Sequence, residues 1–464
     1  MANTQLQKTF SGASNRKTFT LSFWIKRAKI TSGMYIAHVG NQESNPQAGI
    51  EFASNDTFTF WNGGSGGGGS SFTHTTNRKF RDTSAWYHFV IAVDTTQATE
   101  ANRLKIYVNG VQETGFGTGT YPAQNDDLEW NSTQRHTIGA YYNNQSYFDG
   151  LITHWHFVDG TAYTPSTFGE TDSTSGIWKP KTAPSVTYGT NGFFLKFENS
   201  GAMGTDSSGN SNTFTTLGTL TQATDTPSNN FTALNPLLSG TGTGNAAAIT
   251  TAGNTRADVG NNVWRTLTSS IAVSSGKWYF EGFGTSQASA YQHYGITSLA
   301  KFAADATMPD KEINEEQNGY AYGYYGNNGQ IYYSTPSARS NGAYGSSYGA
   351  SDYVGIFVDL DNNKLYVAKN GTLANSGTGY DISADGKPYF LAMSIYGANA
   401  QINFGQGVFG YSGTSYAKLT GTTYADANGH GVFKYSPNQG GASNFDSAAK
   451  NFYALNTENL KEFG

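Results

Sequence analysis

Residues 148–181 read FDGLITHWHFVDGTAYTPSTFGETDSTSGIWKPK, and this stretch decides the fold of the first half of the chain. It begins with a strand pattern in which Leu151, Trp155 and Phe157 alternate with polar neighbours, and it ends in an extended segment marked by proline. It contains no pattern of catalytic residues. A segment of this kind is typical of β-sandwiches that hold and present surfaces, so the functional question becomes what the protein binds.

Alternation with a period of two recurs through the first half. In residues 18–27 (TFTLSFWIKR) one face is apolar, and residues 87–93 are apolar on both faces, which predicts a strand covered on both sides. Residues 104–108 run into Asn109-Gly110, a strong hairpin signal because both turn positions need a positive φ. These strands and turns predict an antiparallel sandwich.

The second half repeats this organisation after a change in composition. Residues 218–262 are rich in Thr, Asn, Gly and Ala with little periodicity, which predicts a linker and lead-in. Strand patterns return from residue 277, and only 299–306 (LAKFAADA) predicts a helix. The sequence therefore predicts an all-β fold of two antiparallel, jelly-roll-like β-sandwich domains in tandem, over 1–217 and 263–464.

A short phrase occurs twice. Residues 230–235 read NFTALN and residues 451–456 read NFYALN, each after a strand-rich module. The repetition suggests a common exit strand or a seam, and chance in low-complexity surroundings is the alternative.

Composition excludes several classes of protein. The 464 residues carry a net charge of −5 and no cysteine, which argues against a nucleic-acid partner, disulfides and thiolate metal sites. No run of 18 apolar residues exists, so no membrane insertion by a helix is expected. The N-terminus lacks the apolar region of a secretory signal, which predicts synthesis in a cytosol.

Parts of the first half resemble a known family. Residues 18–27, 86–110, 148–181 and 188–212 together resemble the laminin-G-like branch of concanavalin-A-type jelly rolls, in the version found in virion proteins of marine tailed phages. In the second half, GKWYFEGF (276–283), YGYYGNNGQIYYS (322–334), DYVGIFVDLDNNKLYVAKNG (352–371) and NFGQ (403–406) resemble a SPRY domain, in the order of that family.

The resemblance implies a non-enzymatic phage virion protein. The leading hypothesis is a tail-fibre or appendage adhesin that binds a host surface glycan or protein. The alternative is a head-decoration or connector protein whose sandwiches bind neighbouring virion subunits. The chain has no heptads for a fibre shaft, which keeps the decoration alternative open. Expected partners are other virion proteins, the host surface and further copies of the chain, with a trimer as the guess from resemblance.

Catalysis has weak support in the sequence. Jelly-roll glycosidases need two carboxylates facing a cleft, and no Glu-x-Asp-x-x-Glu occurs. The acidic clusters around Glu129 and Glu312 are expected to be solvated loops. His154 and His156 share one strand face but lack further metal ligands, so polar residues on an outer sheet face are the preferred interpretation.

Calcium is the cofactor that the family resemblance leaves open. Jelly rolls of this kind often hold the ion at the sandwich rim through carboxylates and carbonyls. Asp149 and Asp159 are expected to shape their turns. Asp206, in the sequence TDSSGN, is the candidate calcium ligand.

Aromatic residues beside amides form the candidate binding surfaces. Rigid rings provide stacking area at low entropic cost, and amides add directional hydrogen bonds. The alternative is that about half of these residues fill cores and subunit seams. A double substitution Tyr324→Ala plus Tyr344→Ala is expected to reduce host attachment without lowering thermal stability. The candidate ligand-binding residues are Trp130, Tyr141, Tyr142, Tyr147, Tyr291, His293, Tyr322, Tyr324, Tyr325, Tyr344 and Tyr348.

Overall fold

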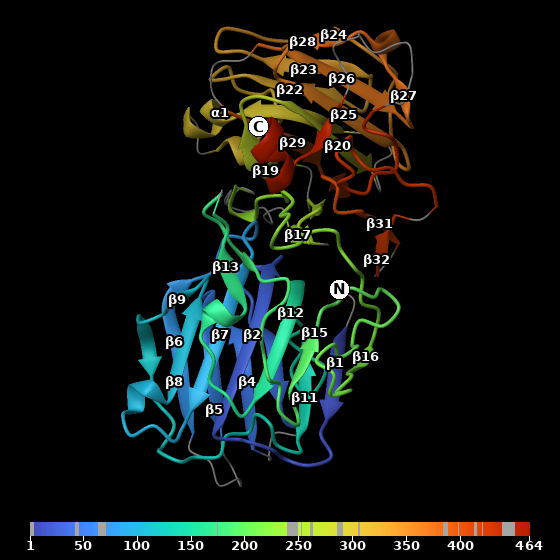
Figure 1. Ribbon diagram of the computed structural model, residues 1–464. Coiled ribbons are helices and arrows are strands. Elements are labelled where there is room, and N and C mark those ends of the chain that lie inside the picture. The colour runs from blue at the N-terminus through green and yellow to red at the C-terminus, as the bar shows by residue number, and fades with distance from the viewer. Residues whose placement is uncertain are drawn as a thin grey trace. The chain divides into compact units, whose positions relative to one another are not determined.

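The computed structural model divides into two compact units, residues 1–222 and 223–464 (Figure 1). Nearly all regular structure is antiparallel sheet with two short α-helices, which confirms the predicted all-β class. The described residues contain no helix long and apolar enough to cross a bilayer. The structure describes residues 4–41, 46–63, 71–173, 175–238, 249–251, 253–259, 263–284, 291–304, 307–383, 388–397, 399–412, 415–419, 421–438 and 451–464.

Unit 1 is a sandwich of two large sheets with a small third one. The eight-stranded sheet has the order β10 (Phe116–Gly119), β6 (Phe72–Lys79), β5 (Thr57–Gly63), β4 (Gln47–Phe52), β3 (Met34–Val39), β11 (Arg135–Ile138), β1 (Gln5–Thr9) and β16 (Thr215–Leu217). The six-stranded sheet has the order β15 (Phe193–Leu195), β12 (Gly150–Asp159), β2 (Thr18–Arg27), β7 (Tyr87–Asp94), β8 (Leu104–Val108) and β9 (Val111–Gln112). The small sheet pairs β13 (Gly169–Thr171) with β14 (Trp178–Pro180).

Aromatic side chains fill the space between the two large sheets. Phe23 stacks on Trp155 with ring centroids 4.4 Å apart, and Phe58 stacks on Phe89 at 4.2 Å. The alternating strands predicted from sequence supply these inward residues. The predicted hairpin is confirmed as well, because β8 and β9 pair across Asn109 and Gly110, whose φ values are 50° and 83°.

One strand departs from simple alternation. The pairing of β12 with β2 shifts register between Thr153 and His156, and His154 takes a φ of 48°. This bulge puts Trp155 and Phe157 in the core, whereas Leu151 pairs with Lys26 on the opposite face. The expected common face for Leu151, Trp155 and Phe157 was therefore wrong, because a bulge inverts the alternation within the strand.

The segment from residue 161 to 190 covers the outer face of the six-stranded sheet. It includes the 3₁₀ helix η2 (Pro165–Thr167), β13 and β14, and it packs Phe168 and Tyr188 on Val90 and Val158. All residues of β7 except the last are consequently buried, which confirms the predicted two-sided cover. We call residues 161–190 the strap.

The buried carboxylate of Asp159, at the end of β12, connects the start of the strap to the rest of unit 1. Asp159 accepts hydrogen bonds from Asn131 Nδ2 at 2.7 Å, Asn191 N at 3.0 Å and Asn15 N at 3.1 Å. Asn191 Nδ2 also donates to Asn131 Oδ1 at 2.8 Å. Asp159 was expected to shape one turn, and in the structure it also joins three distant segments to the end of β12.

Unit 2 is a second sandwich. Its nine-stranded sheet has the path β17 (Ile249–Thr251), β18 (Arg256–Asp258), β30 (Asn399–Asn403), β20 (Lys277–Gly284), β25 (Tyr353–Asp359), β26 (Lys364–Lys369) and β27 (Thr372–Leu373), with β28 (Tyr380–Asp381) on β26 and β33 (Tyr453–Ala454) on β20. Its six-stranded sheet has the order β19 (Trp264–Val273), β29 (Tyr389–Tyr396), β21 (Gln292–Ser298), β22 (Ala321–Tyr325), β23 (Gln330–Ser334) and β24 (Arg339–Ala343). The remaining strands β31 (Val408–Ser412) and β32 (Ser415–Lys418) pair with each other.

The short elements of unit 2 complete the description. Helix α1 (Leu299–Ala304) lies in the segment predicted to be helical. Helix α2 (Thr457–Phe463) was not predicted, and Asn456 caps it by accepting a hydrogen bond from Asn459 N at 2.9 Å. The 3₁₀ helices of the chain outside the strap are η1 (Glu100–Asn102), η3 (Pro236–Leu238), η4 (Met308–Asp310) and η5 (Asn375–Gly377).

The expected linker differs from the structure in its second part. Residues from 223 onward belong to unit 2, and Leu234 is buried in its core, bridged to Ser269 on β19. The repeated phrases lie against each other there, since Phe231 bridges Asn456 and Thr232 N donates to Leu455 O at 3.0 Å. The repetition therefore forms one seam inside unit 2, and composition alone did not reveal that an irregular segment contributes core residues.

A buried ion pair yields a stability prediction for unit 1. Arg27 and Asp56 are fully buried, 3.0 Å apart, and Arg81 also bonds Asp56 at 2.9 Å. Asp56→Asn tolerates the φ of 70° but leaves Arg27 without its counter-charge, so we expect a loss of about 3–5 kcal/mol in chemical denaturation. Glu198, whose side chain is 73% exposed, pairs with Lys196, and Glu198→Gln is the control that should change little. An equally small effect of Asp56→Asn would contradict this account.

Buried histidines predict that unit 1 is sensitive to acid. Burial lowers the pKa of His38 and His136 to about 4 and that of His88 to about 3, and it also lowers those of His74, His154 and His156. The unfolded chain binds these protons near pH 6.5, so the histidines lower the stability of unit 1 as the pH falls below that value. Burial raises the pKa of Glu51, Glu129 and Asp149 in the same unit, which gives the opposite sign, and we expect the six histidines to outweigh these three carboxyl groups.

The measurement is hydrogen exchange of the full chain at pH 7 and pH 5, corrected for intrinsic exchange rates. Protection in the strands of unit 1 should fall at pH 5. In unit 2, burial raises the pKa of Glu281 to about 7. Between pH 4.5 and 7 the folded chain holds a proton on Glu281 that the unfolded chain has released, so Glu281 makes unit 2 more stable as the pH falls. Protection of unit 1 that is constant or rises on acidification would contradict the prediction.

Candidate binding site

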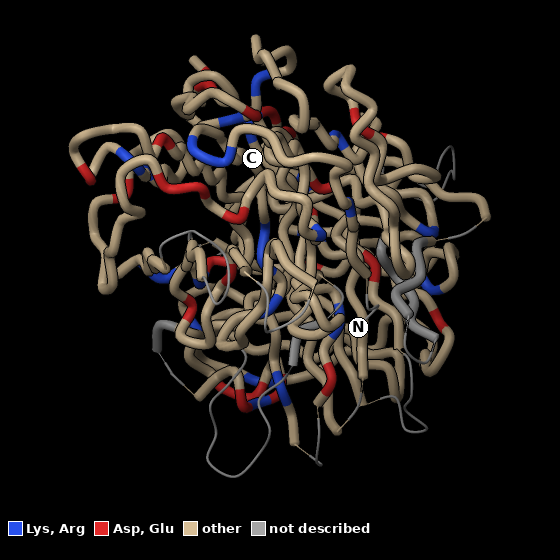
Figure 2. The backbone as a smooth tube through the Cα atoms, turned by 90° about the horizontal axis from the view of Figure 1, so that it is seen from below, with Lys and Arg blue, Asp and Glu red and all other residues tan. Residues whose placement is uncertain are grey.

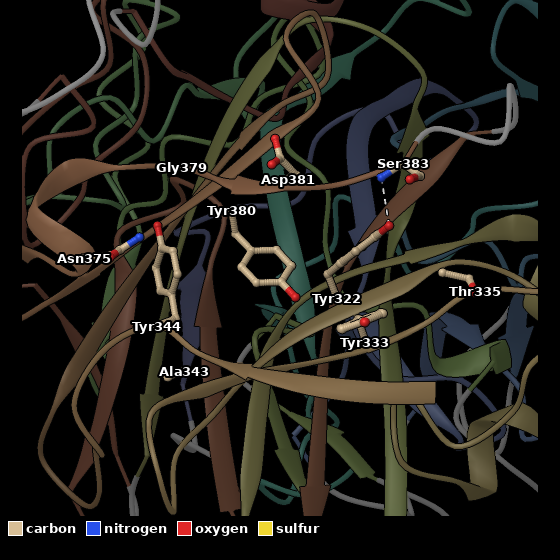
Figure 3. Close-up of a pocket in the computed structure, with 10 residues that line it drawn as sticks. All are labelled: Tyr322, Tyr333, Thr335, Ala343, Tyr344, Asn375, Gly379, Tyr380, Asp381 and Ser383. Atoms are coloured by element: carbon tan, nitrogen blue, oxygen red, sulfur yellow. Dashed lines mark hydrogen bonds between the residues drawn. The ribbon is translucent and has the colours of Figure 1, made fainter. Parts of the chain in front are cut away.

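A pocket of about 460 Å³ lies at one edge of unit 2, where β22, β23 and β24 face β28 (Figure 3). Its wall is built from both sheets, because β28 pairs with β26 of the nine-stranded sheet. We call it the tyrosine pocket. Its lining residues are Tyr322, Tyr333, Thr335, Ala343, Tyr344, Asn375, Gly379, Tyr380, Asp381 and Ser383.

Tyr380 stands at the centre of the four tyrosines (Figure 3). Its ring centroid is 6.0 Å from that of Tyr344, 6.3 Å from Tyr333 and 6.4 Å from Tyr322. Tyr322 and Tyr333 stack at 6.2 Å. The four rings hold one another at fixed angles, so the aromatic wall is preformed.

The hydroxyl groups of the four tyrosines fall into two classes. Tyr344 Oη donates to Thr378 O at 2.9 Å, and Tyr322 Oη accepts from Ser383 N at 2.7 Å. Among the residues that the structure describes, no group bonds the hydroxyls of Tyr333 and Tyr380. The first pair fixes the wall, and the second pair is available to a ligand.

The electrostatics of the pocket keep three of its tyrosine hydroxyls protonated. Burial raises the pKa of Tyr380 to about 12, with Tyr333, Tyr322 and the carboxylate of Asp381 adding to the effect. Burial also raises the pKa values of Tyr322 and Tyr344. At neutral pH Tyr322, Tyr344 and Tyr380 are therefore neutral O–H groups. Among the described lining residues the acidic side chain is Asp381, which accepts a hydrogen bond from Lys364 Nζ at 2.6 Å.

The sequence-predicted aromatic residues separate into three environments. Tyr322 and Tyr344 line the tyrosine pocket, but Tyr333 and Tyr380 were missed as site residues. The Tyr/Gly pattern of 320–333 pointed to the hairpin that carries Tyr333. No local signal marked Tyr380, because only the sheet pairing of β28 brings it there.

A second group lies on the outer face of the six-stranded sheet of unit 2. His293 stacks on Tyr325 at 4.4 Å, and Tyr291 lies 6.4 Å from Tyr325 and is 37% exposed. Trp264 and Tyr396 extend this group, which we call the sheet-face cluster. His293 is buried beneath it and bonds Glu312 at 2.8 Å.

In unit 1, Tyr141 and Tyr142 form a smaller cluster on the eight-stranded sheet. Tyr141 packs on Tyr35 at 4.4 Å and on His38 at 4.6 Å, and its hydroxyl donates to Gln47 Oε1 at 3.0 Å. Tyr147 is half-buried, and its backbone forms an isolated parallel β-bridge with Tyr35.

Three predicted ligand contacts lie wholly inside the two sandwich cores, since Trp130, Tyr324 and Tyr348 are 3%, 0% and 2% exposed. Tyr322 and Tyr344, at 3% and 6%, also belong to the core of unit 2, and they form the wall of the pocket from there. The hydroxyl of Tyr348 donates to Gln292 O at 2.9 Å, inside unit 2. The double substitution Tyr324→Ala plus Tyr344→Ala would remove core volume at both positions, so the structure argues against the expectation that it spares thermal stability. Sequence could not separate inward from outward tyrosines within the Tyr/Gly-rich strands.

Side chains with catalytic potential have structural partners. Trp178 Nε1 donates to His88 Nδ1 at 2.9 Å, so the proton of His88 is on Nε2 and faces Ser22 Oγ at 2.9 Å. His88 thus donates to Ser22 and cannot serve as its base. Glu129 is buried against Arg16 at 2.9 Å, which corrects the expected solvated loop.

The same holds for the other acidic cluster and for the histidine pair. Glu312 bonds His293 and Arg339, each at 2.8 Å, and those contacts lower its pKa although burial alone would raise it. The expectation of a solvated loop around Glu312 is therefore corrected as well, because its carboxylate is paired with two side chains. His156 Nδ1 lies 2.8 Å from Tyr188 Oη and its ring stacks on Phe194 at 3.9 Å, so it is covered by the strap.

Asp206, the candidate calcium ligand, has donors on both carboxylate oxygens. Phe194 N and Ser208 N donate to Oδ1 at 2.9 and 2.8 Å, and Asn212 N and Ser208 Oγ donate to Oδ2 at 2.7 and 2.9 Å. These bonds close the loop 206–212 against β15. The described residues contain no group of three or more acidic or histidine side chains placed to hold a metal. Calcium binding at Asp206 stays a prediction, and it would compete with this loop.

Comparison with known families supports the two-domain organisation. Residues 3–167 match the concanavalin A-like lectin/glucanases superfamily in its laminin-G form, and residues 271–407 match the SPRY domain. The chain therefore carries a laminin-G-like domain followed by a SPRY domain, two classes that usually bind rather than catalyse. A search of curated proteins finds no significant match.

Solved structures give only distant likenesses. The SPRY domain of human HERC1 matches at 12% identity and a TM-score of 0.29, covering 37% of this chain and 96% of that one. Domains LG4-5 of the mouse laminin alpha1 chain match at 10% identity and 0.27, covering 85% and 78%. The heptameric SAP-like pentraxin from Limulus polyphemus matches at 15% and 0.25, covering 35% and 71%.

The hydrogen bonds of Asp206 predict a structural role that is measurable. Asp206→Ala leaves four donors without their acceptor, and we expect unit 1 to lose at least about 2 kcal/mol of stability, read by thermal or urea unfolding. If these hydrogen bonds alone hold the loop, a chelator leaves the unfolding temperature of the unsubstituted chain unchanged. A lower unfolding temperature with chelator, reversed by added calcium, would instead show that the chain binds calcium.

Proposed function

We propose that this chain is a non-catalytic recognition protein on the surface of a phage virion, an adhesin that binds a glycan or protein of the host surface. The tyrosine pocket carries the proposal, because among its described residues it offers a preformed aromatic wall, two hydroxyls without a partner and no catalytic pair. The sequence resemblance to virion proteins supports the location, with other virion proteins and further copies of the chain as partners.

A structural role is the second candidate. The sheet-face cluster favours it, since exposed aromatic side chains such as Tyr291 are typical of protein contacts. In that case the protein decorates the head or forms a connector, and the cluster packs on a neighbouring subunit.

The charge distribution adds one constraint on the partner. Basic and acidic positions are interspersed along the described backbone (Figure 2). A partner recognised through rings and hydroxyl groups suits this surface better than one held by a strong field of one sign.

We expect the purified full chain to bind host cells and to compete with intact particles for adsorption. Immunogold labelling with an antibody against residues 263–464 should mark tail or appendage tips. Light scattering should give a trimer. Label spread over the head, together with no competition for adsorption, would favour the structural candidate.

A further inference from the structure

We propose that the tyrosine pocket is a subsite for one neutral pyranose unit of a glycan and that it disfavours acidic sugars. The inference rests on the proposed recognition function and narrows its ligand. The two hydroxyls of Tyr333 and Tyr380, the shape of the ring cluster and the charge of the lining each support it.

The size and the walls of the pocket suit a sugar. Its volume of about 460 Å³ lies within the range of small-molecule sites, roughly 300–1,000 Å³. Tyr380 presents a ring that is half-buried and held by three neighbouring tyrosines. The axial C–H groups of a pyranose pack on such a ring, which loses little conformational entropy on binding.

The polar atoms of the pocket match a ligand that both donates and accepts hydrogen bonds. The hydroxyls of Tyr333 and Tyr380 can do both, and neither has a partner among the described residues. Asn375 Nδ2 donates a hydrogen bond to Thr378 O at 3.2 Å, and its Oδ1 is available as an acceptor. Ring hydroxyls of a sugar satisfy donors and acceptors at once, whereas a carboxylate only accepts.

The charge of the lining disfavours an acidic ligand. Among the described residues, the lining includes the carboxylate of Asp381 and no Lys, Arg or His. The nearby cation, Lys364, is engaged with Asp381 Oδ1 at 2.6 Å. Because Asp381 is 89% exposed, screening limits its repulsion, and we expect a modest preference of roughly fivefold for a neutral sugar over its uronic acid.

Two neighbouring residues provide a matched test. Tyr333 and Tyr332 are consecutive on β23, so their side chains point to opposite faces of the sheet. Tyr332 contacts the sheet-face cluster through Tyr325 at 4.9 Å, and Tyr333 lines the pocket. Tyr333→Phe and Tyr380→Phe remove pocket hydroxyls and keep the rings, and Tyr332→Phe removes one outside the pocket.

The experiment titrates the full chain with methyl glycosides of neutral hexoses and N-acetylhexosamines, and with glucuronic acid, by ligand-observed NMR. We expect at least one neutral sugar to bind with a Kd of about 1 mM, typical of a small ligand with few contacts. The double variant Tyr333→Phe/Tyr380→Phe should weaken it roughly tenfold, and Tyr332→Phe should not. Asp381→Asn should bring the ratio of neutral to acidic affinity towards one.

The other outcomes separate a failure of the pyranose subsite from a failure of the adhesin proposal. Binding that the double variant retains would place the sugar elsewhere, and equal or tighter binding of glucuronic acid would overturn the selectivity. If no neutral sugar binds while the chain still attaches to host cells, the pyranose subsite is wrong and the adhesin proposal stands. If a sugar binds through Tyr333 and Tyr380 but the chain does not attach to cells, the subsite stands and the adhesin proposal fails.

Discussion

The six-stranded sheet of unit 1 must be covered on both faces, and the strap provides the outer cover. Strand β14 of the strap brings Trp178 to His88, where the indole N–H donates to Nδ1 and leaves Nε2 to bond Ser22. A buried imidazole without such partners would cost several kcal/mol. The fit is tight, since a Cβ at Gly169 would lie 2.5 Å from the Trp178 ring. Residues 148–181 therefore supply both the core strand β12 and most of the layer that covers the sheet containing it.

Both units use a buried carboxylate to fasten a distant segment. Asp159 joins Asn15, Asn131 and Asn191 in unit 1. In unit 2, Glu281 accepts from Lys434 N at 2.9 Å and Tyr435 N at 2.8 Å, which holds the segment after the SPRY-like strands on β20. Burial of a carboxylate is costly unless donors surround it, so each such group is specific for one arrangement of the chain. Chain segments without regular structure are placed in this way rather than by sheet pairing.

The aromatic residues serve three purposes that composition does not separate. Phe and Trp residues between the sheets of unit 1 form its core, whereas tyrosines in unit 2 are divided among core, sheet face and pocket. A tyrosine whose hydroxyl meets a backbone carbonyl, such as Tyr344, fixes the structure. One whose hydroxyl meets none, such as Tyr380, is available for recognition. This distinction, rather than the number of aromatic residues, locates the candidate site.

The sequence by itself determined the class of fold, the order of the two domains, the two-sided cover of β7 and the hairpin at Asn109-Gly110, because alternation and turn chemistry are local properties. It did not determine the bulge in β12, the place of Leu234 in the core of unit 2 or the meeting of the two repeated phrases. It also could not distinguish Tyr332 from Tyr333, or bring Tyr380 to Tyr322. Those features depend on which strands pair across long separations in the chain, and only the tertiary structure decides that pairing.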